Sequence, residues 1–161
     1  MIKKIKKEQL FNLAIVILLT GISLLVIFKF VLNKPAQDSF AIKEIDQVLV
    51  TDLMGNEIPL TKWLSNNDAT YFLAFDLKDC FGCISKGMEE LKSLKNSGKS
   101  CFGLVIDDYY QDVAVWASNY EYLHFLVLKR SEFYDHIKSA LTPVIFKIEN
   151  GKVTGYRFIT P

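Results

Sequence analysis

The 161-residue chain is poor in the residues that build metal centres and disulfide frameworks. It has only three cysteines and two histidines, whereas a structural zinc site needs four ligands and a disulfide scaffold needs several cysteine pairs. The formal net charge is +1, so no excess of basic residues indicates nucleic-acid binding, and we expect no nucleic-acid partner. The chain also lacks internal repeats and low-complexity tracts, which argues against repeat architectures.

Charge is absent from one long stretch near the N-terminus. No ionisable residue occurs from Gln9 to Phe28, where Leu, Ile, Val and Phe dominate. About 20 such residues, each rising about 1.5 Å in a helix, span the hydrocarbon layer of a membrane. We therefore predict a transmembrane anchor in the lipid bilayer over residues 9–31, preceded by a basic cytoplasmic tail over residues 1–8.

The lysines before this stretch predict its orientation. Lys3, Lys4, Lys6 and Lys7 precede it, and positive flanking charge keeps that end in the cytoplasm. The rest of the chain is then extracytoplasmic, on a single-pass protein of the cell membrane. A cleaved signal peptide is the alternative, but the run is long and bulky residues over 28–30 stand where a small-residue cleavage site is needed. A soluble core helix conflicts with apolar residues on every face.

Residues 32–45 are mixed and polar, include Pro35 and show no clear period. We interpret them as a linker that holds a domain over residues 46–161 near the membrane. Half of the residues in the chain are apolar, which is sufficient for the core of one such domain. Its cysteines would lie in an oxidising compartment, where a dithiol stays reduced only if a partner supplies electrons.

The motif Cys80-Phe81-Gly82-Cys83 lies between a predicted strand over Tyr71–Phe75 and a predicted helix that runs to about Lys95. A Cys-x-x-Cys in this setting is typical of thiol redox chemistry. Cys80 would sit where unpaired backbone N–H groups and the helix dipole favour a thiolate, the attacking species. Cys83, one turn in and more buried, would resolve a mixed disulfide. We therefore take Cys80 and Cys83 as the catalytic pair, which calls for no cofactor.

Two other interpretations of the motif stay open. Half of a zinc site has the same spacing, but the remaining candidate ligands are Cys101, His124 and His136, and none of them forms a second close pair. We expect no metal. A purely structural disulfide is the second alternative. Cys101 lies in an apolar run and is expected to be a buried thiol, and the two histidines to be core-edge or surface residues.

Alternating strand and helix patterns fill the rest of the domain. A short strand around Val48–Leu53 turns at Met54–Glu57 into an edge strand Ile58–Leu60, and Thr61 is a candidate cap for a helical turn. Further strands are expected at Cys101–Ile106, Leu123–Leu128, Val144–Ile148 and Lys152–Ile159, the last two joined by a turn at Asn150-Gly151. One helix is expected after Asp107-Asp108, which end the preceding strand, and its apolar positions are Val113, Val115, Trp116 and Tyr120. A second helix is expected after a cap at Ser131, with inward side chains at Phe133, Tyr134, Ile137 and Leu141. This order predicts a three-layer α/β domain with a mixed sheet.

These residues carry a family resemblance. The chain resembles membrane-anchored thioredoxin-like thiol–disulfide oxidoreductases of the TlpA/ResA kind in three features. These are a strand followed by Cys80-x-x-Cys83 and a helix, Thr142-Pro143 directly before a strand, and the hairpin over 149–153. The segment over 52–60 is similar to the added N-terminal hairpin of that group, and the match covers the chain from about residue 46. The resemblance implies a thioredoxin-like fold, a cis peptide bond at Pro143, and substrate contacts at Thr142, Pro143 and Phe81.

The same resemblance implies reduction of disulfides in specific exported proteins, such as those of cytochrome c maturation, with electrons from a membrane donor protein. Several residues depart from the family pattern: Asp79 replaces a frequent Trp, Phe81 a frequent Pro, Ala74 a buried acid of thioredoxins, and Met88 a helix proline. A carboxylate beside Cys80 opposes its thiolate, while Lys78 favours it. The departures leave open a non-catalytic binding or assembly factor with a structural disulfide, or a metal carrier. Related copper-delivery proteins use Cys-x-x-x-Cys plus His, and the spacing here is one residue shorter.

Overall fold

The computed structural model describes residues 17–18, 20–21, 40–65, 68–139 and 141–160. The chain divides into two units, residues 1–37 and residues 38–161. In the first unit, Ile17, Leu18, Thr20 and Gly21 are helical. Among the residues that the structure describes, no helix is both long enough and apolar enough to cross a membrane. The predicted basic tail and nearly all of the predicted anchor over 9–31 lie outside the described residues, so both stay predictions.

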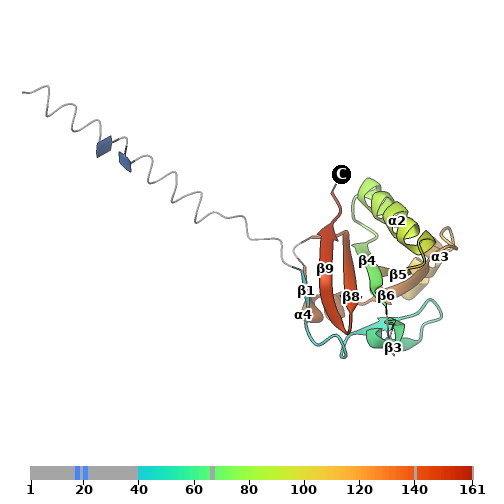
Figure 1. The fold of residues 1–161 in the computed structure, drawn as a ribbon. Helices are drawn as coiled ribbons and strands as arrows, with labels where there is room; N and C mark the ends of the chain where they lie inside the picture. Colours follow the sequence, from blue (N-terminus) through green and yellow to red (C-terminus); the bar gives the residue numbers. More distant parts are fainter. Residues whose placement is uncertain (1–16, 19, 22–39, 66–67, 140, 161) are drawn as a thin grey trace, which may run out of the picture. The chain divides into compact units, whose positions relative to one another are not determined.

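The second unit alternates strands and helices as expected (Figure 1). In chain order its elements are β1 (Ala41–Ile42), β2 (Leu49–Thr51), β3 (Glu57–Pro59), the 3-10 helix η1 (Leu60–Trp63), β4 (Thr70–Asp76), α2 (Phe81–Asn96), β5 (Ser100–Ile106), α3 (Tyr110–Ala117), β6 (His124–Leu128), α4 (Arg130–His136), β7 (Ile137–Lys138), β8 (Val144–Glu149) and β9 (Lys152–Phe158).

In the described part of the chain, seven strands form one mixed sheet in the order β3-β2-β6-β5-β4-β8-β9. The pairs β4–β5 and β5–β6 are parallel, and the remaining pairs are antiparallel. The parallel strands therefore end together at one edge of the sheet, after Asp76, Ile106 and Leu128. The β8–β9 hairpin turns at Asn150 and Gly151, both with positive φ, as the predicted Asn-Gly turn requires.

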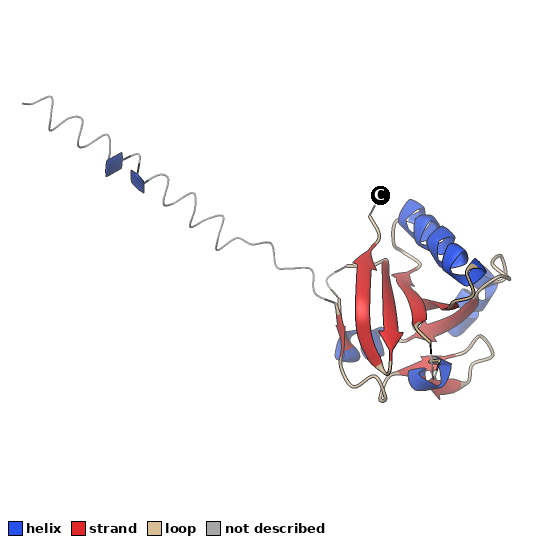
Figure 2. Ribbon diagram, in the orientation of Figure 1, coloured by secondary structure: helices blue, strands red, loops and turns tan. Residues whose placement is uncertain are grey.

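Apolar side chains on the two faces of the sheet make two cores. On one face, Leu73 and Phe75 of β4 pack with residues of α2 and α3. On the other face, Phe72 and Ala74 pack with Phe133 of α4 and with residues of η1 and β1. Figure 2 shows helices on both sides of the sheet. The expected three layers and mixed sheet are confirmed, since strand alternation sends consecutive β4 side chains into opposite cores.

The folded unit begins earlier than the predicted boundary at residue 46. Phe40 is buried and stacks on Phe146 with ring centroids 4.7 Å apart. Ala41 and Ile42 then pair with β7 as an antiparallel strand. The end of the predicted linker over 32–45 was therefore wrong. One buried phenylalanine and a two-residue strand are too short to form a recognisable sequence pattern.

Helix boundaries and inward positions account for the remaining errors. η1 begins at Leu60 and Thr61 is not its cap. Helix α4 begins at Arg130, one residue before the predicted cap Ser131, and ends at His136 because the chain then pairs with β1. The predicted inward positions Val115, Tyr134 and Leu141 are exposed, whereas Val113, Phe133 and Ile137 are buried. Helix α3 has eight residues and buries Val113 and Ala117, and α4 has seven and buries Phe133. Leu141 lies after β7, outside the helix that was predicted to include it.

Candidate active site

The two cysteines of the motif lie at the N-terminus of α2, where the loop from β4 meets the helix. Cys80 is the residue before the first helical residue and is exposed, whereas the Cys83 side chain is 3% exposed. The Cys80 carbonyl accepts the backbone N–H groups of Cys83 at 2.9 Å and Ile84 at 3.0 Å. Both sulfurs are therefore presented by the first helical turn, as the spacing predicted, with one accessible to a reactant and one behind it.

The two thiols are chemically unequal. A hydrogen bond from the Cys83 thiol, together with backbone N–H groups of Cys83 and Gly82, holds the pKa of Cys80 below its ordinary value, against the opposing charge of Asp79. The same thiol–thiol hydrogen bond, with burial and nearby negative charge, raises the pKa of Cys83. Cys80 is thus the group that ionises first and can attack, while Cys83 holds its proton until later.

The peptide bond between Thr142 and Pro143 is cis, as the family resemblance implied. Val144 pairs with Ala74, so this loop meets the sheet at the edge where β4 ends and the redox loop begins. Pro143 is buried and its carbonyl accepts the N–H of Ile159 at 2.8 Å, whereas Thr142 is partly exposed. The structure therefore brings the second predicted site element to the same edge as the cysteines.

Asp79 joins the redox loop to the Thr142 loop. Its Oδ1 accepts the Thr142 hydroxyl at 3.1 Å, and its Oδ2 accepts the Asp76 N–H at 2.9 Å. Sequence reasoning treated this residue only as a charge that opposes the Cys80 thiolate. The turn after β4 had a local signal, since Asp is one of the residues that favour turns. The contact with Thr142, far along the chain, had none.

An ion-pair network supports the loop from the side of α4. Arg130 contacts the Asp76 carboxylate through Nη1, and its backbone N–H donates to Asp108 Oδ1 at 3.1 Å. Burial favours the neutral acid, but the hydrogen bonds from Arg130 and Lys78 prevail and hold the pKa of Asp76 below its ordinary value. Arg130 was not predicted as a site residue. Asp76, Asp108 and Arg130 lie at the ends of β4, β5 and β6, and they come together only because these strands are neighbours in the sheet.

Exposed apolar side chains flank the site. Phe81, directly after Cys80, is 73% exposed, and Leu141, directly before Thr142, is 49% exposed. Phe81 was predicted to contact substrate, whereas Leu141 was predicted to lie inward on a helix. Two exposed apolar groups beside a reactive thiol can contact an apolar stretch of a protein substrate.

The third cysteine and the histidines lie away from this arrangement. Cys101 pairs with Tyr71 at the opposite end of β4 from Asp76, roughly 16 Å along the strand at about 3.3 Å per residue. It is 5% exposed, which confirms the expected buried thiol, and burial raises its pKa to about 11. His124 is exposed at the start of β6, and His136 lies 3.7 Å from Glu132. Asp107 and Asp108 directly follow β5, as expected for a strand end, and Asp107 Oδ1 accepts the N–H groups of Asp108 and Tyr109 in the following turn.

A metal centre needs several donor side chains that converge on one point. Within the described ranges, no group of three or more His, Cys, Asp or Glu side chains is arranged to hold a metal ion. The described residues around Cys80 and Cys83 therefore do not fit a copper centre with three protein ligands.

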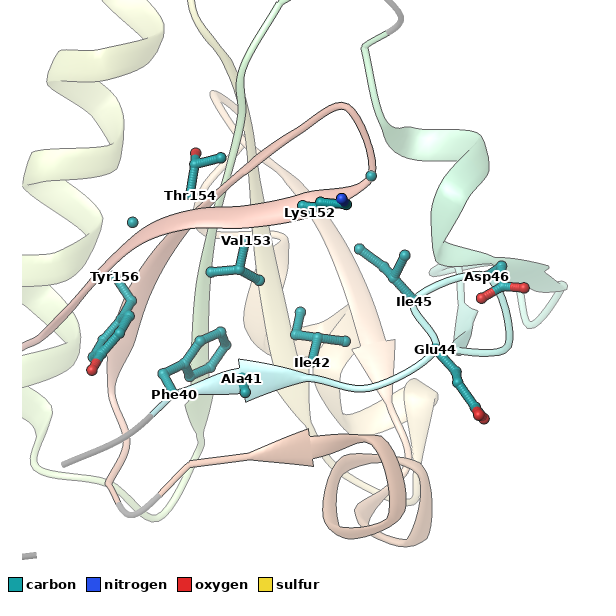
Figure 3. A pocket seen from close by; sticks show the side chains of 12 residues that line it. Phe40, Ala41, Ile42, Glu44, Ile45, Asp46, Lys152, Val153, Thr154 and Tyr156 are labelled. Carbon is teal, nitrogen blue, oxygen red and sulfur yellow. The ribbon is translucent and has the colours of Figure 1, made fainter. Parts of the chain in front are cut away.

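One pocket of about 550 Å³ lies between the β1 segment and β9 (Figure 3). Phe40 and Ile42 of that segment and Val153 of β9 point toward one another in it, and Glu44 and Lys152 lie at its rim. None of the predicted site residues lines this pocket. The candidate chemistry is thus at the exposed strand edge and not in this cavity.

No protein-family model and no curated protein sequence matches this chain. Solved structures do match its fold. A thio-disulfide isomerase from Thermus thermophilus is 14% identical with a TM-score of 0.55, covering 75% of this chain and 87% of that one. A thiol:disulfide interchange protein from Bacteroides sp. is 15% identical with a TM-score of 0.54, covering 68% and 75%. Copper-bound ScoI from Arabidopsis thaliana is 11% identical with a TM-score of 0.52, covering 69% and 85%. The fold of residues 40–160 is therefore thioredoxin-like.

Proposed function

We propose that this protein is a membrane-tethered, extracytoplasmic thiol–disulfide oxidoreductase that reduces disulfides of exported proteins. One observation carries the proposal: an exposed Cys80 with a lowered pKa stands beside a buried Cys83 and next to a cis Thr142–Pro143 loop. The thioredoxin-like fold of solved oxidoreductases supports it. The uncharged run over residues 9–28 after a lysine-rich start supports the tether.

The reaction is an exchange of two electrons and two protons between dithiols and disulfides. The Cys80 thiolate attacks one sulfur of the substrate disulfide, forms a mixed disulfide and releases the other substrate sulfur as a thiolate. Cys83 then loses its proton, attacks Cys80 Sγ and releases the second substrate thiolate. The substrate leaves as a dithiol and the protein holds a Cys80–Cys83 disulfide. A dithiol donor protein at the membrane regenerates the reduced pair by the same exchange in reverse.

The roles of the surrounding residues follow from their positions. Thr142 is partly exposed next to the redox loop, where its backbone is available to an extended segment of the substrate. Phe81 offers an exposed apolar surface beside Cys80. Lys86, three residues after Cys83, donates to the Thr160 carbonyl at 3.0 Å and favours the Cys83 thiolate by its charge. This assists the second step, in which Cys83 must ionise.

Replacement of Cys83 by Ser tests the proposal by trapping. The Cys83→Ser variant leaves Cys80 able to attack but removes the resolving thiol, so mixed disulfides with substrates should accumulate in cells and disappear on reduction. The double variant Cys80→Ser/Cys83→Ser is the matched control, and Cys101→Ser should trap nothing. Recovery of no mixed disulfide from the Cys83→Ser strain would count against exchange.

The redox potential of the pair decides the direction of electron flow. A value near that of thioredoxin, about −270 mV, makes the protein a reductant that needs an electron source, whereas about −120 mV makes it an oxidant.

The second candidate function is a non-catalytic binding or assembly factor with a fixed disulfide, which is favoured by the charge of Asp79, because that charge opposes ionisation of both thiols. A pair that does not cycle in thiol buffers supports that candidate.

A further inference from the structure

Asp79 is held by three hydrogen bonds that leave its carboxylate little freedom. Its own N–H donates to the Asp76 carbonyl at 2.9 Å, and its Oδ2 accepts the Asp76 N–H at 2.9 Å. These two bonds close the loop between β4 and the motif. Its Oδ1 accepts the Thr142 hydroxyl at 3.1 Å. One side chain therefore ties together the residue before Cys80 and the residue before Pro143, which are 63 positions apart.

Among the described residues, no ion pair cancels the charge on this carboxylate. The neighbouring acid Asp76 is paired with Arg130, whereas the described contacts of Asp79 are hydrogen bonds to a hydroxyl and an N–H. The charge of Lys86 acts on Cys83 in the opposite sense to that of Asp79. The negative charge of Asp79 opposes ionisation of both thiols of the motif.

We propose that Asp79 is a positioning residue that fixes the Thr142–Pro143 loop against the redox loop and keeps the reduction potential of the Cys80–Cys83 pair low. The inference rests on the proposed exchange function. The couple is a disulfide plus two electrons and two protons in equilibrium with a dithiol. A thiolate arises only in the reduced form, so a fixed negative charge penalises that form and not the disulfide. The pair then gives up its electrons more readily, which suits a reductant.

Two variants separate the charge from the tether. Asp79→Asn removes the charge, and both contacts can persist because its one carbonyl oxygen can accept the Asp76 N–H while its amide N–H donates to the Thr142 hydroxyl oxygen. Thr142→Val removes only the hydroxyl and keeps the charge. Thr142→Ser, which retains the hydroxyl, is the matched control. The readouts are the equilibrium with glutathione, followed by alkylation of the full chain in detergent, and the rate of exchange with a disulfide-bonded peptide.

Asp79→Asn should shift the glutathione equilibrium about threefold toward the dithiol, which is about 14 mV for a two-electron couple. Thr142→Val should leave that equilibrium unchanged but slow exchange with the peptide several-fold, and Thr142→Ser should restore the rate. Protection of the buried Cys101 from alkylation reports that each variant is folded.

The inference is overturned if Asp79→Asn has the wild-type potential, or if Thr142→Val moves the potential as far as Asp79→Asn does. Should Asp79→Asn fail to protect Cys101, Thr142→Val alone still tests the tether: a wild-type peptide rate overturns that half. A wild-type pair that never cycles in glutathione contradicts the proposed function instead, so the two failures are distinct.

Discussion

Gly87 of α2 lies directly against the Leu73 side chain of β4. A Cβ added at Gly87 would stand 2.8 Å from Leu73 Cδ1, a separation that real Cβ atoms do not adopt. Leu73 is fully buried in the core beneath α2, and Gly87 is one of the buried positions of that helix. The helix that carries Cys83 therefore approaches the sheet closely because this position lacks a side chain, and the glycine is required by packing even though it weakens the helix.

Gly87→Ala should destabilise the domain by about 1–2 kcal/mol, since overpacking of about 1–3 kcal/mol outweighs a helix-propensity gain of up to about 1 kcal/mol. Urea unfolding measures the change. Gly82→Ala is the control in the same helix, because the nearest atom to its added Cβ is 3.9 Å away, and it should be neutral or slightly stabilising. A stabilised Gly87→Ala variant would contradict the packing argument.

Loss of the thiol donor at Cys83 should raise the pKa of Cys80. In the wild type the hydrogen bond from the Cys83 thiol is the largest influence that lowers it. Cys83→Ala removes that donor, whereas Cys83→Ser retains a hydroxyl. The pH dependence of Cys80 alkylation, measured in a Cys101→Ser background, should place the Ala variant above the Ser variant. Equal values for both variants would show that the backbone N–H groups alone set the thiolate.

Phe81→Ala should slow exchange with a peptide disulfide several-fold while leaving exchange with glutathione unchanged, since only the larger substrate reaches the ring. Because the side chain is 73% exposed, the stability should change by no more than about 0.5 kcal/mol. Tyr134→Ala is the matched control: this aromatic on α4 is equally exposed, at 73%. Equal rates for Phe81→Ala and wild type would remove Phe81 from the substrate site.

Arg130→Gln should destabilise the domain by about 1–3 kcal/mol at neutral pH, because it leaves the partly buried Asp76 carboxylate without its partner. The pKa of Asp76 is lowered from its ordinary 3.8, so the pair stabilises the fold above about that pH and loses its effect as the pH falls through the lower folded value. The difference between variant and wild type should shrink below pH 3.8. The neighbouring Lys129→Gln breaks an exposed pair with Glu57 and should change stability by less than about 1 kcal/mol.

Alkaline stability should depend on Cys101. Burial raises the pKa of this thiol from its ordinary 9.0 to about 11, so the folded state binds more protons than the unfolded state between these values. Stability should then fall as the pH rises through this window, by about 2–3 kcal/mol in total. Cys101→Ala should show a shallower fall in urea unfolding under reducing conditions. Parallel curves for the two proteins would contradict this assignment.

Local pattern was sufficient for the elements that position the cysteines. The apolar run before Cys80 and the helical spacing after Cys83 predicted β4 and α2, because strand and helix periods are set by neighbouring residues. The Asn150-Gly151 turn and the edge position of the strand with Pro59 were predicted on the same basis and are confirmed. The cis bond at Pro143 was expected from resemblance and not from local pattern.

Only the tertiary structure decided which distant side chains meet at the site. The contacts of Asp79 with Thr142 and of Arg130 with Asp76 join residues more than fifty positions apart. They arise because the sheet brings the ends of β4, β5 and β6 and the start of β8 to the same edge. Sheet order also decided that Phe40 joins the core and that Leu141 does not. Such contacts depend on long-range strand pairing, which no periodicity along the chain encodes, whereas the redox motif itself is a property of four consecutive residues.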